Sequence, residues 1–403
     1  MYKSLSLLVL LLIFSLSALG QQHVVQGRVV DELTEKPLEF VSVYVNTTTI
    51  GTSTNEAGAF SLKLPDGHYE LIVSYLGYEP IIYPVNTAAL PKSIVFKLRP
   101  KENALQEVVV KGMHDKQWYD NLAVFKEKFL GLSEFGRQSK LLNPEILTIT
   151  FDSEAGLLEV QADEPLQIRN EALGYKMEYL LTDFRFYGRE GYTIYLGYPR
   201  YELMQGSKGK RKRWERNRLR AYNGSVLHFV RAVQQKRLEE EGFNLRRLYR
   251  TPNPDRPTEE QIAAARAALR ASGGAMQTGG DDSISDILSR ARLPKMIESL
   301  DINPVPYSDY LQQHAGGAKL AFEGFFQVVY IGEKEEEEYV WQQSMFSERK
   351  PSYQTSVIYL ESDEVHLESN GNIIEPLNVF FEGYWGWEKL GDMLPLDYKP
   401  AAE

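Results

Sequence analysis

The sequence predicts a mainly β protein in which a small antiparallel sandwich is followed by an α+β domain. Residues 24–100 form short runs that alternate apolar and polar residues between turn residues, which is the pattern of antiparallel strands. Beyond residue 115, helical patterns with one apolar face stand between further strand-like runs. The composition agrees, because 12% of the residues are aromatic and 24 are tyrosines, which favour strands.

The first twenty residues have the pattern of a secretory signal peptide. Lys3 supplies a positive charge, residues 7–16 an apolar run, and Ala18 with Gly20 a small-residue cleavage site. The apolar run is shorter than the ~20 residues that cross a membrane as a helix. We expect cleavage after Gly20 and export to the periplasm or the outer membrane.

Composition narrows the compartment and the class of partner. The chain has no cysteine, which excludes disulfides, thiolate metal sites and a lipid-modified N-terminal cysteine. An exported chain without disulfides fits a bacterial periplasm. The formal net charge of −10 argues against nucleic-acid binding. After the signal peptide, no apolar run is long enough for a membrane-spanning helix.

The stretch GTSTNEAGAFSL, residues 51–62, joins two strands of the expected sandwich. Its threonines favour extended backbone, and Asn55 can bond its own backbone two residues on. Gly58 accepts a positive φ without steric cost, and Phe60 then starts the next strand with its ring inward. The stretch is therefore interpreted as a structural turn and not as a phosphate-binding loop.

The sandwich also carries a series of motifs: Gly27 before an acidic turn, Pro37 with Val41, the run GTST, Gly58 with Phe60, and SYLGYEP. These motifs resemble the carboxypeptidase-regulatory-like domain. The resemblance implies a seven-stranded transthyretin-like sandwich without catalytic residues. An Asp often stands in that family where this chain has Asn55, and both residues suit the turn.

In one bacterial lineage such a domain precedes TonB-dependent outer-membrane receptors and is followed by a segment similar to ALQEVVVKG at residues 104–112. The resemblance implies the cell envelope as context. The plug and barrel of those receptors do not follow here, so the receptor function is not carried over. The whole chain also resembles exported bacterial proteins that share the terminal segment YWGWEKLGDMLPLDY, which implies architecture only.

We expect one α+β domain after the sandwich, interrupted by an insertion, with strands from both sides of the insertion in one sheet system. The expected boundaries are residues 1–20 for the signal peptide, 22–100 for the sandwich, 101–114 for a linker, 115–249 for the first part of the α+β domain, 250–292 for a mobile helical and Gly-rich insertion, and 293–403 for the β-rich second part.

Three helices are expected within the α+β domain. One runs from an Asp115 N-cap to Gly131, one covers residues 225–242, and one begins at Thr258 with Gln261 completing a capping box. Strands are expected in the remaining runs. These include YVWQQSMF at residues 339–346, NVFFEGYWGW at residues 378–387, and a hairpin turn in ESNGN.

No catalytic motif stands out. The six histidines lack HExxH spacing, and there is no nucleophile elbow, dinucleotide fingerprint or P-loop. Carboxylates are abundant, but the sequence does not show which of them face each other. We expect no metal, no cofactor and a non-enzymatic role. The alternative is a periplasmic hydrolase directed at glycan or peptide, with a site assembled from dispersed residues.

The run GSKGKRKRWERNRLR, residues 206–220, is the densest basic segment. One interpretation is an anion-binding loop for lipopolysaccharide phosphates, acidic glycans or a partner. The other is a solvated hairpin loop, balanced by the acidic run at residues 332–339. The candidate binding residues are Lys208, Lys210, Arg211, Lys212, Arg213 and Trp214.

Tyr384, Trp385 and Trp387 near the C-terminus form the second candidate site. They would provide an aromatic platform for sugar rings or a protein partner, or they belong to the core. The resulting hypothesis is a non-enzymatic cell-envelope binding or assembly protein. The partners that fit this compartment are an envelope glycan, lipopolysaccharide or an outer-membrane protein.

Overall fold

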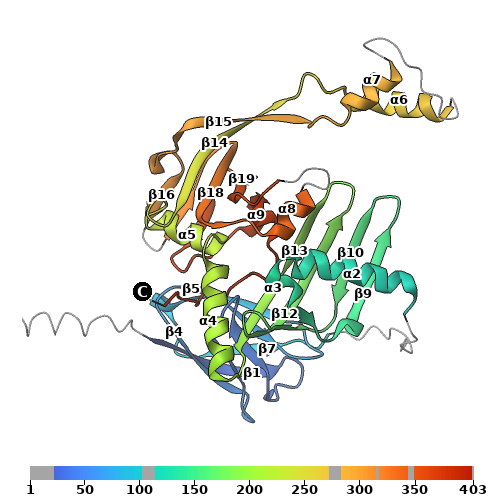
Figure 1. Ribbon diagram of the computed structural model, residues 1–403. Helices are drawn as coiled ribbons and strands as arrows, with labels where there is room; N and C mark the ends of the chain where they lie inside the picture. The colour runs from blue at the N-terminus through green and yellow to red at the C-terminus, as the bar shows by residue number, and fades with distance from the viewer. Residues whose placement is uncertain (1–21, 102–113, 272–282, 315–316, 344–348, 402–403) are drawn as a thin grey trace, which may run out of the picture.

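The computed structural model describes residues 22–101, 114–271, 283–314, 317–343 and 349–401, and these are built mainly from β-sheets (Figure 1). The fold class expected from the sequence is confirmed. The expected signal peptide, nearly all of the linker and the Gly-rich part of the insertion lie outside the described residues. Within the described part of the chain, no helix has the length and apolar character needed to cross a membrane.

Two sheets form the N-terminal sandwich, with strand orders β4–β1–β7 and β3–β2–β5–β6. Between them lies a core of small and branched apolar side chains, most of them valines and leucines. The seven strands are β1 (His23–Asp31), β2 (Ser42–Val45), β3 (Gly51–Ser53), β4 (Ala59–Leu64), β5 (His68–Ser74), β6 (Ile81–Asn86) and β7 (Ile94–Leu98).

The turn between β3 and β4 has the chemistry expected of it. The Asn55 side-chain oxygen accepts hydrogen bonds from the backbone N–H groups of Ala57 and Ala59, at 3.1 and 2.9 Å. Gly58 has a φ of 69°, and a Cβ there would lie 2.5 Å from the Val29 carbonyl oxygen. The Phe60 ring is 5% exposed and stacks on Phe96, with ring centroids 5.8 Å apart.

Phe60→Ala should lower the free energy of unfolding by about 3–5 kcal/mol, because it empties a ring-sized space in the sandwich core. Val95→Ala on β7 is the control, since Val95 is 58% exposed. Its effect should stay within about 0.5 kcal/mol, as for other surface substitutions. Urea denaturation of both variants measures the difference, and equal effects would show that the Phe60 ring does not support the core.

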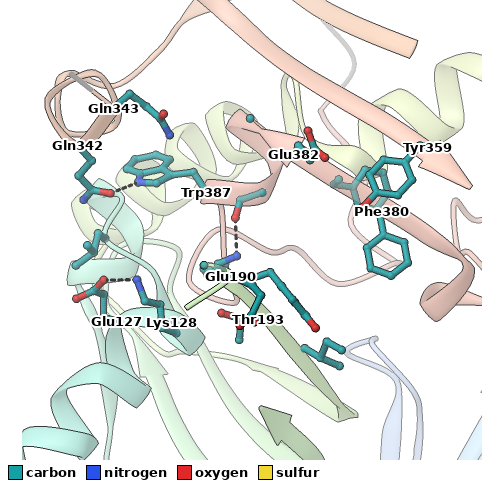
Figure 2. Close-up of a pocket in the computed structure, with 18 of the residues that line it drawn as sticks. Glu127, Lys128, Glu190, Thr193, Gln342, Gln343, Tyr359, Phe380, Glu382 and Trp387 are labelled. Carbon is teal, nitrogen blue, oxygen red and sulfur yellow. Dashed lines mark hydrogen bonds and ion pairs between the residues drawn. The ribbon is translucent and has the colours of Figure 1, made fainter. Parts of the chain in front are cut away.

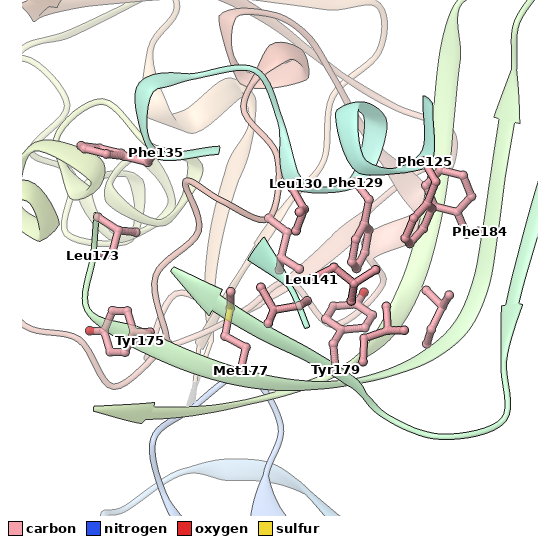
Figure 3. Close-up of a cluster of buried hydrophobic side chains, with 14 of the residues drawn as sticks. Phe125, Phe129, Leu130, Phe135, Leu141, Leu173, Tyr175, Met177, Tyr179 and Phe184 are labelled. Atoms are coloured by element: carbon pink, nitrogen blue, oxygen red, sulfur yellow. The ribbon is translucent and has the colours of Figure 1, made fainter. Parts of the chain in front are cut away.

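The second sheet joins six strands in the order β8–β11–β12–β10–β9, with β13 paired to β12. The helix α2 (Lys116–Leu130) lies across one face and directs Phe125 and Phe129 against Phe184 and Tyr179 (Figure 3). The strands are β8 (Ser139–Leu141), β9 (Leu147–Asp152), β10 (Leu157–Ala162), β11 (Leu166–Asn170), β12 (Tyr175–Tyr187) and β13 (Tyr192–Leu203).

Both ends of α2 follow the sequence signals. The Asp115 carboxylate accepts a hydrogen bond from the Trp118 N–H, and Gly131 ends the helix with a φ of 95°. Along the chain α2 is followed by α3 (Glu134–Arg137), α4 (Lys208–Tyr222) and α5 (Val226–Gln234), and the buried residues of α5 belong to the core of the third sheet described below. The helix expected over residues 225–242 therefore ends earlier, and Lys236 just beyond it has a left-handed backbone with a φ of 55°.

A third, five-stranded sheet has the order β15–β14–β18–β19–β21, beside a small sheet β16–β17–β20. Because β14 pairs with both β15 and β18, strands from either side of the insertion share one sheet, as expected. The strands are β14 (Phe243–Pro252), β15 (Met296–Pro304), β16 (Leu311–His314), β17 (Gly317–Leu320), β18 (Phe325–Lys334), β19 (Tyr353–Leu360), β20 (Val365–Glu368) and β21 (Val379–Gly383).

The insertion lies at the end of an arm. β14 and β15 form a long hairpin that carries α6 (Glu259–Ala271) and α7 (Ile284–Arg290) away from the rest of the molecule (Figure 1). The expected capping box is confirmed, because Thr258 and Gln261 exchange hydrogen bonds between backbone N–H groups and side-chain oxygens at 2.9 and 3.2 Å.

Near the C-terminus one expected strand is wrong and another is confirmed only in its first half. The segment YVWQQSMF contributes to α8 (Glu337–Gln343), where two glutamates in the first turn favour the helix start. The segment NVFFEGYWGW divides into β21 and α9 (Tyr384–Trp387), because Gly383 turns the chain with a φ of 70°. The hairpin turn in ESNGN is confirmed, with Gly371 at a φ of 96°.

Residues 388–398 connect all three parts of the molecule. Leu390 and Leu394 are buried in the core beneath α2. The Leu396 N–H donates to the Thr47 carbonyl of the sandwich at 2.7 Å. Arg231 on α5 donates to the carbonyls of Leu396 and Tyr398 at 2.8 and 3.0 Å, and to that of Asn370 at 2.9 Å. We call residues 388–398 the C-terminal strap.

Arg231→Met should destabilise the protein by about 2–4 kcal/mol, because three buried or partly buried carbonyls lose a charged donor. Arg237→Met is the matched control, since its ion pairs with Glu240 and Glu241 lie at the surface and contribute about 0–1 kcal/mol. Urea denaturation measures both. Equal stability of the two variants would mean that Arg231 does not hold the strap.

Candidate functional site

An open groove of about 860 Å³ lies between the second and third sheets (Figure 2). One wall comes from the end of α2 and the β12–β13 turn, and the other from β19, β21, α8 and α9. A volume of this size is typical of ligand sites, which favour boundaries between structural units. We therefore take this groove as the candidate site.

Aromatic side chains supply the apolar surface of the groove. Tyr359 and Phe380 lie directly opposite each other on β19 and β21, with ring centroids 5.3 Å apart and planes inclined by 15°. Trp387 is half-buried, and its indole N–H donates to the Gln342 side-chain oxygen at 3.2 Å. Tyr192 on the opposite wall is 45% exposed. One face of Tyr192 stacks on Tyr187, and the remaining exposed parts of these rings line both walls of the groove.

Most charged groups of the groove are held by hydrogen bonds or ion pairs within the protein. Lys128 forms an ion pair with Glu127 at 2.7 Å. Arg250 donates two hydrogen bonds to the Glu382 carboxylate, at 3.0 and 2.6 Å. Lys389 donates to the Gly386 carbonyl at 2.5 Å. Such contacts fix these side chains and reduce the charge that they present to the groove.

Several carboxylates that interact with one another near Lys389, a residue of the groove, have raised pKa values. Burial raises the pKa of Asp392 to about 7, and it raises the pKa of Glu388 well above its usual range, with the Asp392 charge adding to the effect. Burial likewise raises the pKa of Glu333 to about 7. Burial lowers the pKa of Lys389 to about 8, helped by the charge of Lys128. The charge on this group of residues therefore changes with pH near neutrality.

The free energy of unfolding should fall as pH rises from about 4 to about 7. The pKa of Asp392 is 3.8 in its ordinary state and about 7 in the folded protein, so the folded state holds a proton more tightly across this window. Asp392→Asn should flatten this dependence, because its amide can donate to Ser133 Oγ and accept from the Lys389 N–H, the two groups that Asp392 contacts.

Asp363→Asn provides the control, since Asp363 is exposed. Its unfolding free energy should depend on pH as in the unmodified chain. Urea unfolding at several pH values compares the three proteins. An equally steep decline in the Asp392→Asn variant would show that this carboxylate is not the source of the pH dependence.

The aromatic candidates divide between core and groove. Tyr384 and Trp385 are 3% and 6% exposed, and the Trp385 indole N–H donates to the Gly224 carbonyl at 2.6 Å. These two residues are therefore part of the core and cannot form an exposed platform. Trp387 alone of the three lines the groove.

The basic candidates lie on a helix, so the expected loop is wrong. Ser207 caps α4, and its side-chain oxygen accepts from the Lys210 N–H. Trp214 is 2% exposed and donates to the Glu171 carbonyl at 3.0 Å, which makes it an anchor of the helix instead of a surface residue. The five cations of the first turns are exposed: Lys208, Lys210, Arg211, Lys212 and Arg213.

The acidic run at residues 332–339 contacts a later residue of the basic segment. Arg220 pairs with Glu134 at 2.6 Å and lies 4.0 Å from Glu336. Among the described residues, none of the five exposed cations of α4 forms an ion pair. The expected balance between the two runs therefore involves Arg220 and not the start of the helix.

His228 on α5 has the satisfied environment expected of a core histidine. It is 5% exposed, its Nδ1 accepts from the Gly224 N–H at 3.1 Å, and its Nε2 lies 3.2 Å from Glu241. Burial lowers its pKa. Within the ranges that the structure describes, no group of three or more His, Asp or Glu side chains is arranged to hold a metal ion.

The sequence did not identify most of the groove. Its residues come from segments hundreds of positions apart, and each belongs to an ordinary helix end, turn or strand. The adjacent aromatic residues in NVFFEGYWGW indicated that some of them are buried. They did not indicate which ones line the groove. The Gly191 turn between β12 and β13 was a visible signal for a hairpin, although nothing in it indicated a binding wall.

Residues 25–110 match the family model of the CarboxypepD_reg-like domain, and this domain forms the N-terminal sandwich. The chain is similar to the TonB-dependent receptor SusC of Bacteroides thetaiotaomicron, with 35% identity over 112 residues. That match covers 28% of this chain and 10% of the receptor, so the chain spans only a small part of the receptor's length.

Two solved structures of Bacteroides proteins, the genus of that receptor, also match this chain. A putative membrane-associated protein of unknown function from Bacteroides fragilis is 9% identical, with a TM-score of 0.17, and the match covers 90% of this chain and 95% of that one. A DUF3823 family protein from Bacteroides ovatus is 8% identical, with a TM-score of 0.15, over 47% of this chain and 83% of that one.

Proposed function

We propose that the protein is a non-enzymatic binding or assembly protein of the bacterial cell envelope, and that the groove between the second and third sheets holds its ligand. The N-terminal domain supports the envelope context, because a TonB-dependent receptor carries a similar segment. The observation that carries the binding role is the lining of the groove, where aromatic side chains of both walls are at least partly exposed and most charged groups are held by the protein.

The lining favours a ligand rich in hydroxyl groups, such as a chain of an envelope glycan. Aromatic rings pack well against the apolar faces of flat, rigid ligands. Gln342 offers an amide that both donates and accepts, and the Thr193 hydroxyl does the same. A hydroxyl also donates and accepts, so these groups complement it better than they complement a purely anionic or cationic ligand.

The competing function is a periplasmic hydrolase. It would use Glu190 and Glu361, two glutamates of the groove, as its catalytic carboxylates. Both glutamates line the groove and are exposed, and neither is in an ion pair within the described residues. Hydrolysis of a glycosidic bond needs two carboxylates on opposite sides of the bond. The two functions therefore differ in whether these glutamates are needed for turnover of a bound chain.

Trp387→Ala should weaken binding of neutral oligosaccharides, prepared from bacterial envelope polysaccharide, by about tenfold or more, because a central aromatic anchor is lost. Trp387→Phe should retain most of the affinity. Trp341→Ala is the control, since Trp341 lies on α8 next to Gln342 but is 65% exposed and outside the groove. Isothermal titration calorimetry measures all four proteins.

Mass spectrometry of the oligosaccharides before and after incubation separates binding from hydrolysis. Unchanged chains that bind the protein agree with the proposal. Cleaved chains, with cleavage abolished in Glu190→Gln or Glu361→Gln, would establish the hydrolase instead. Absence of binding, or equal binding by the Trp387→Ala and Trp341→Ala variants, would overturn the role of the groove.

A further inference from the structure

The first turns of α4 concentrate positive charge on an acidic protein. Five of the six residues from Lys208 to Arg213 are Lys or Arg, and all five side chains are exposed, whereas the chain as a whole has a formal net charge of −10. Successive side chains of a helix point about 100° apart, so these cations surround the helix. We call these five residues the basic end of α4.

The basic end is not explained by the stability of its helix. Cations near the first turn of a helix face the positive end of the helix dipole, which is unfavourable by about 0.3–1 kcal/mol for each charge near the end. The first turn of α4 has no acidic residue to offset them. The sequence thus keeps Lys208, Lys210 and Arg211 in a first turn where positive charge weakens the helix.

The second half of α4 holds the helix to the body of the protein. Trp214 is buried, and Arg218 donates to the carbonyls of Leu173 and Gly174 at 2.7 and 3.1 Å. Asn217 donates to the Ala172 carbonyl at 2.8 Å. The helix therefore has a fixed inner half and an exposed basic end, which is a suitable arrangement for presenting charge to an external surface.

Charge complementarity identifies the kind of surface. Within the described residues the basic end has no carboxylate partner in the protein, so its charges are available to a phosphate-bearing partner. Leu203, an apolar side chain that is 51% exposed, precedes α4 by five residues in the sequence. Cations with adjacent apolar side chains suit a lipid headgroup region better than a soluble polyanion.

We propose that the basic end of α4 binds the anionic phospholipid headgroups of a membrane surface. This interaction is independent of the groove and goes beyond the proposed binding of a glycan chain. Each exposed Lys or Arg near an anionic bilayer adds to the attraction, and the attraction weakens within a Debye length of ~8–10 Å at physiological salt.

The test measures binding of the chain starting at Gln21 to vesicles, because the apolar residues before it would bind lipid by themselves. Vesicles of phosphatidylcholine with phosphatidylglycerol are compared with vesicles of phosphatidylcholine alone, at low and high salt. The protein should bind the anionic vesicles at low salt, and high salt should release it. Replacement of all five cations of the basic end by Gln should lower the affinity by about tenfold or more.

The control neutralises five exposed cations elsewhere and changes the net charge by the same amount. The chosen residues are Arg28, Lys36, Lys63, Lys92 and Lys140, which are exposed and form no ion pair among the described residues. This control should retain most of the vesicle binding. Thermal melts should show an equal or higher melting temperature for the variant that lacks the basic end, because unfavourable charges leave the helix start.

Equal binding by the unmodified chain and the variant lacking the basic end would overturn the proposal, as would an equal loss in the control. Binding to a soluble acidic polysaccharide but not to the anionic vesicles would also overturn it. The single variants Lys208→Gln, Arg211→Gln and Arg213→Gln carry the test if the five-fold variant does not fold, and each should lower the affinity measurably.

Discussion

The C-terminal strap is the constraint on which the arrangement of the molecule depends. Leu390 and Leu394 fill the core beneath α2, and the Thr49 side chain and backbone N–H donate to the Asp397 carboxylate of the strap. Arg231 adds the third connection from α5. Because each contact comes from a different part of the chain, the strap fixes the three parts relative to one another. One residue of the strap, Lys389, also lines the groove between two of these parts.

The same segment introduces buried charge. Glu388 and Asp392 lie four residues apart, and burial raises the pKa of both, while Lys389 between them lines the groove with a lowered pKa. Burial of a charge is costly unless it is paired, so protonation of these carboxylates stabilises the strap. Because Lys389 lines the groove, protonation of Glu388 and Asp392 on either side of it is expected to affect this wall of the groove. An apolar strap would lack this connection.

Local signals predicted the elements whose chemistry is complete within a few residues. The Asn55 turn, the Asp115 cap of α2 and the Thr258 capping box formed as expected because each depends on neighbouring backbone groups. The helix α4 was missed because its apolar contacts are few, and long-range packing of Trp214 stabilises it. The groove was missed for a related reason, since only tertiary packing brings Tyr192 near Trp387.

The distribution of charge favours one orientation of the protein on an anionic bilayer. The start of α4 lies beside the sandwich, at the opposite end of the molecule from the β14–β15 arm (Figure 1). An acidic protein that approaches an anionic bilayer is repelled over most of its surface and attracted at its basic end. Attachment through that end alone favours one orientation, with the arm directed away from the bilayer. Attachment through the basic end and binding in the groove therefore use separate parts of the fold.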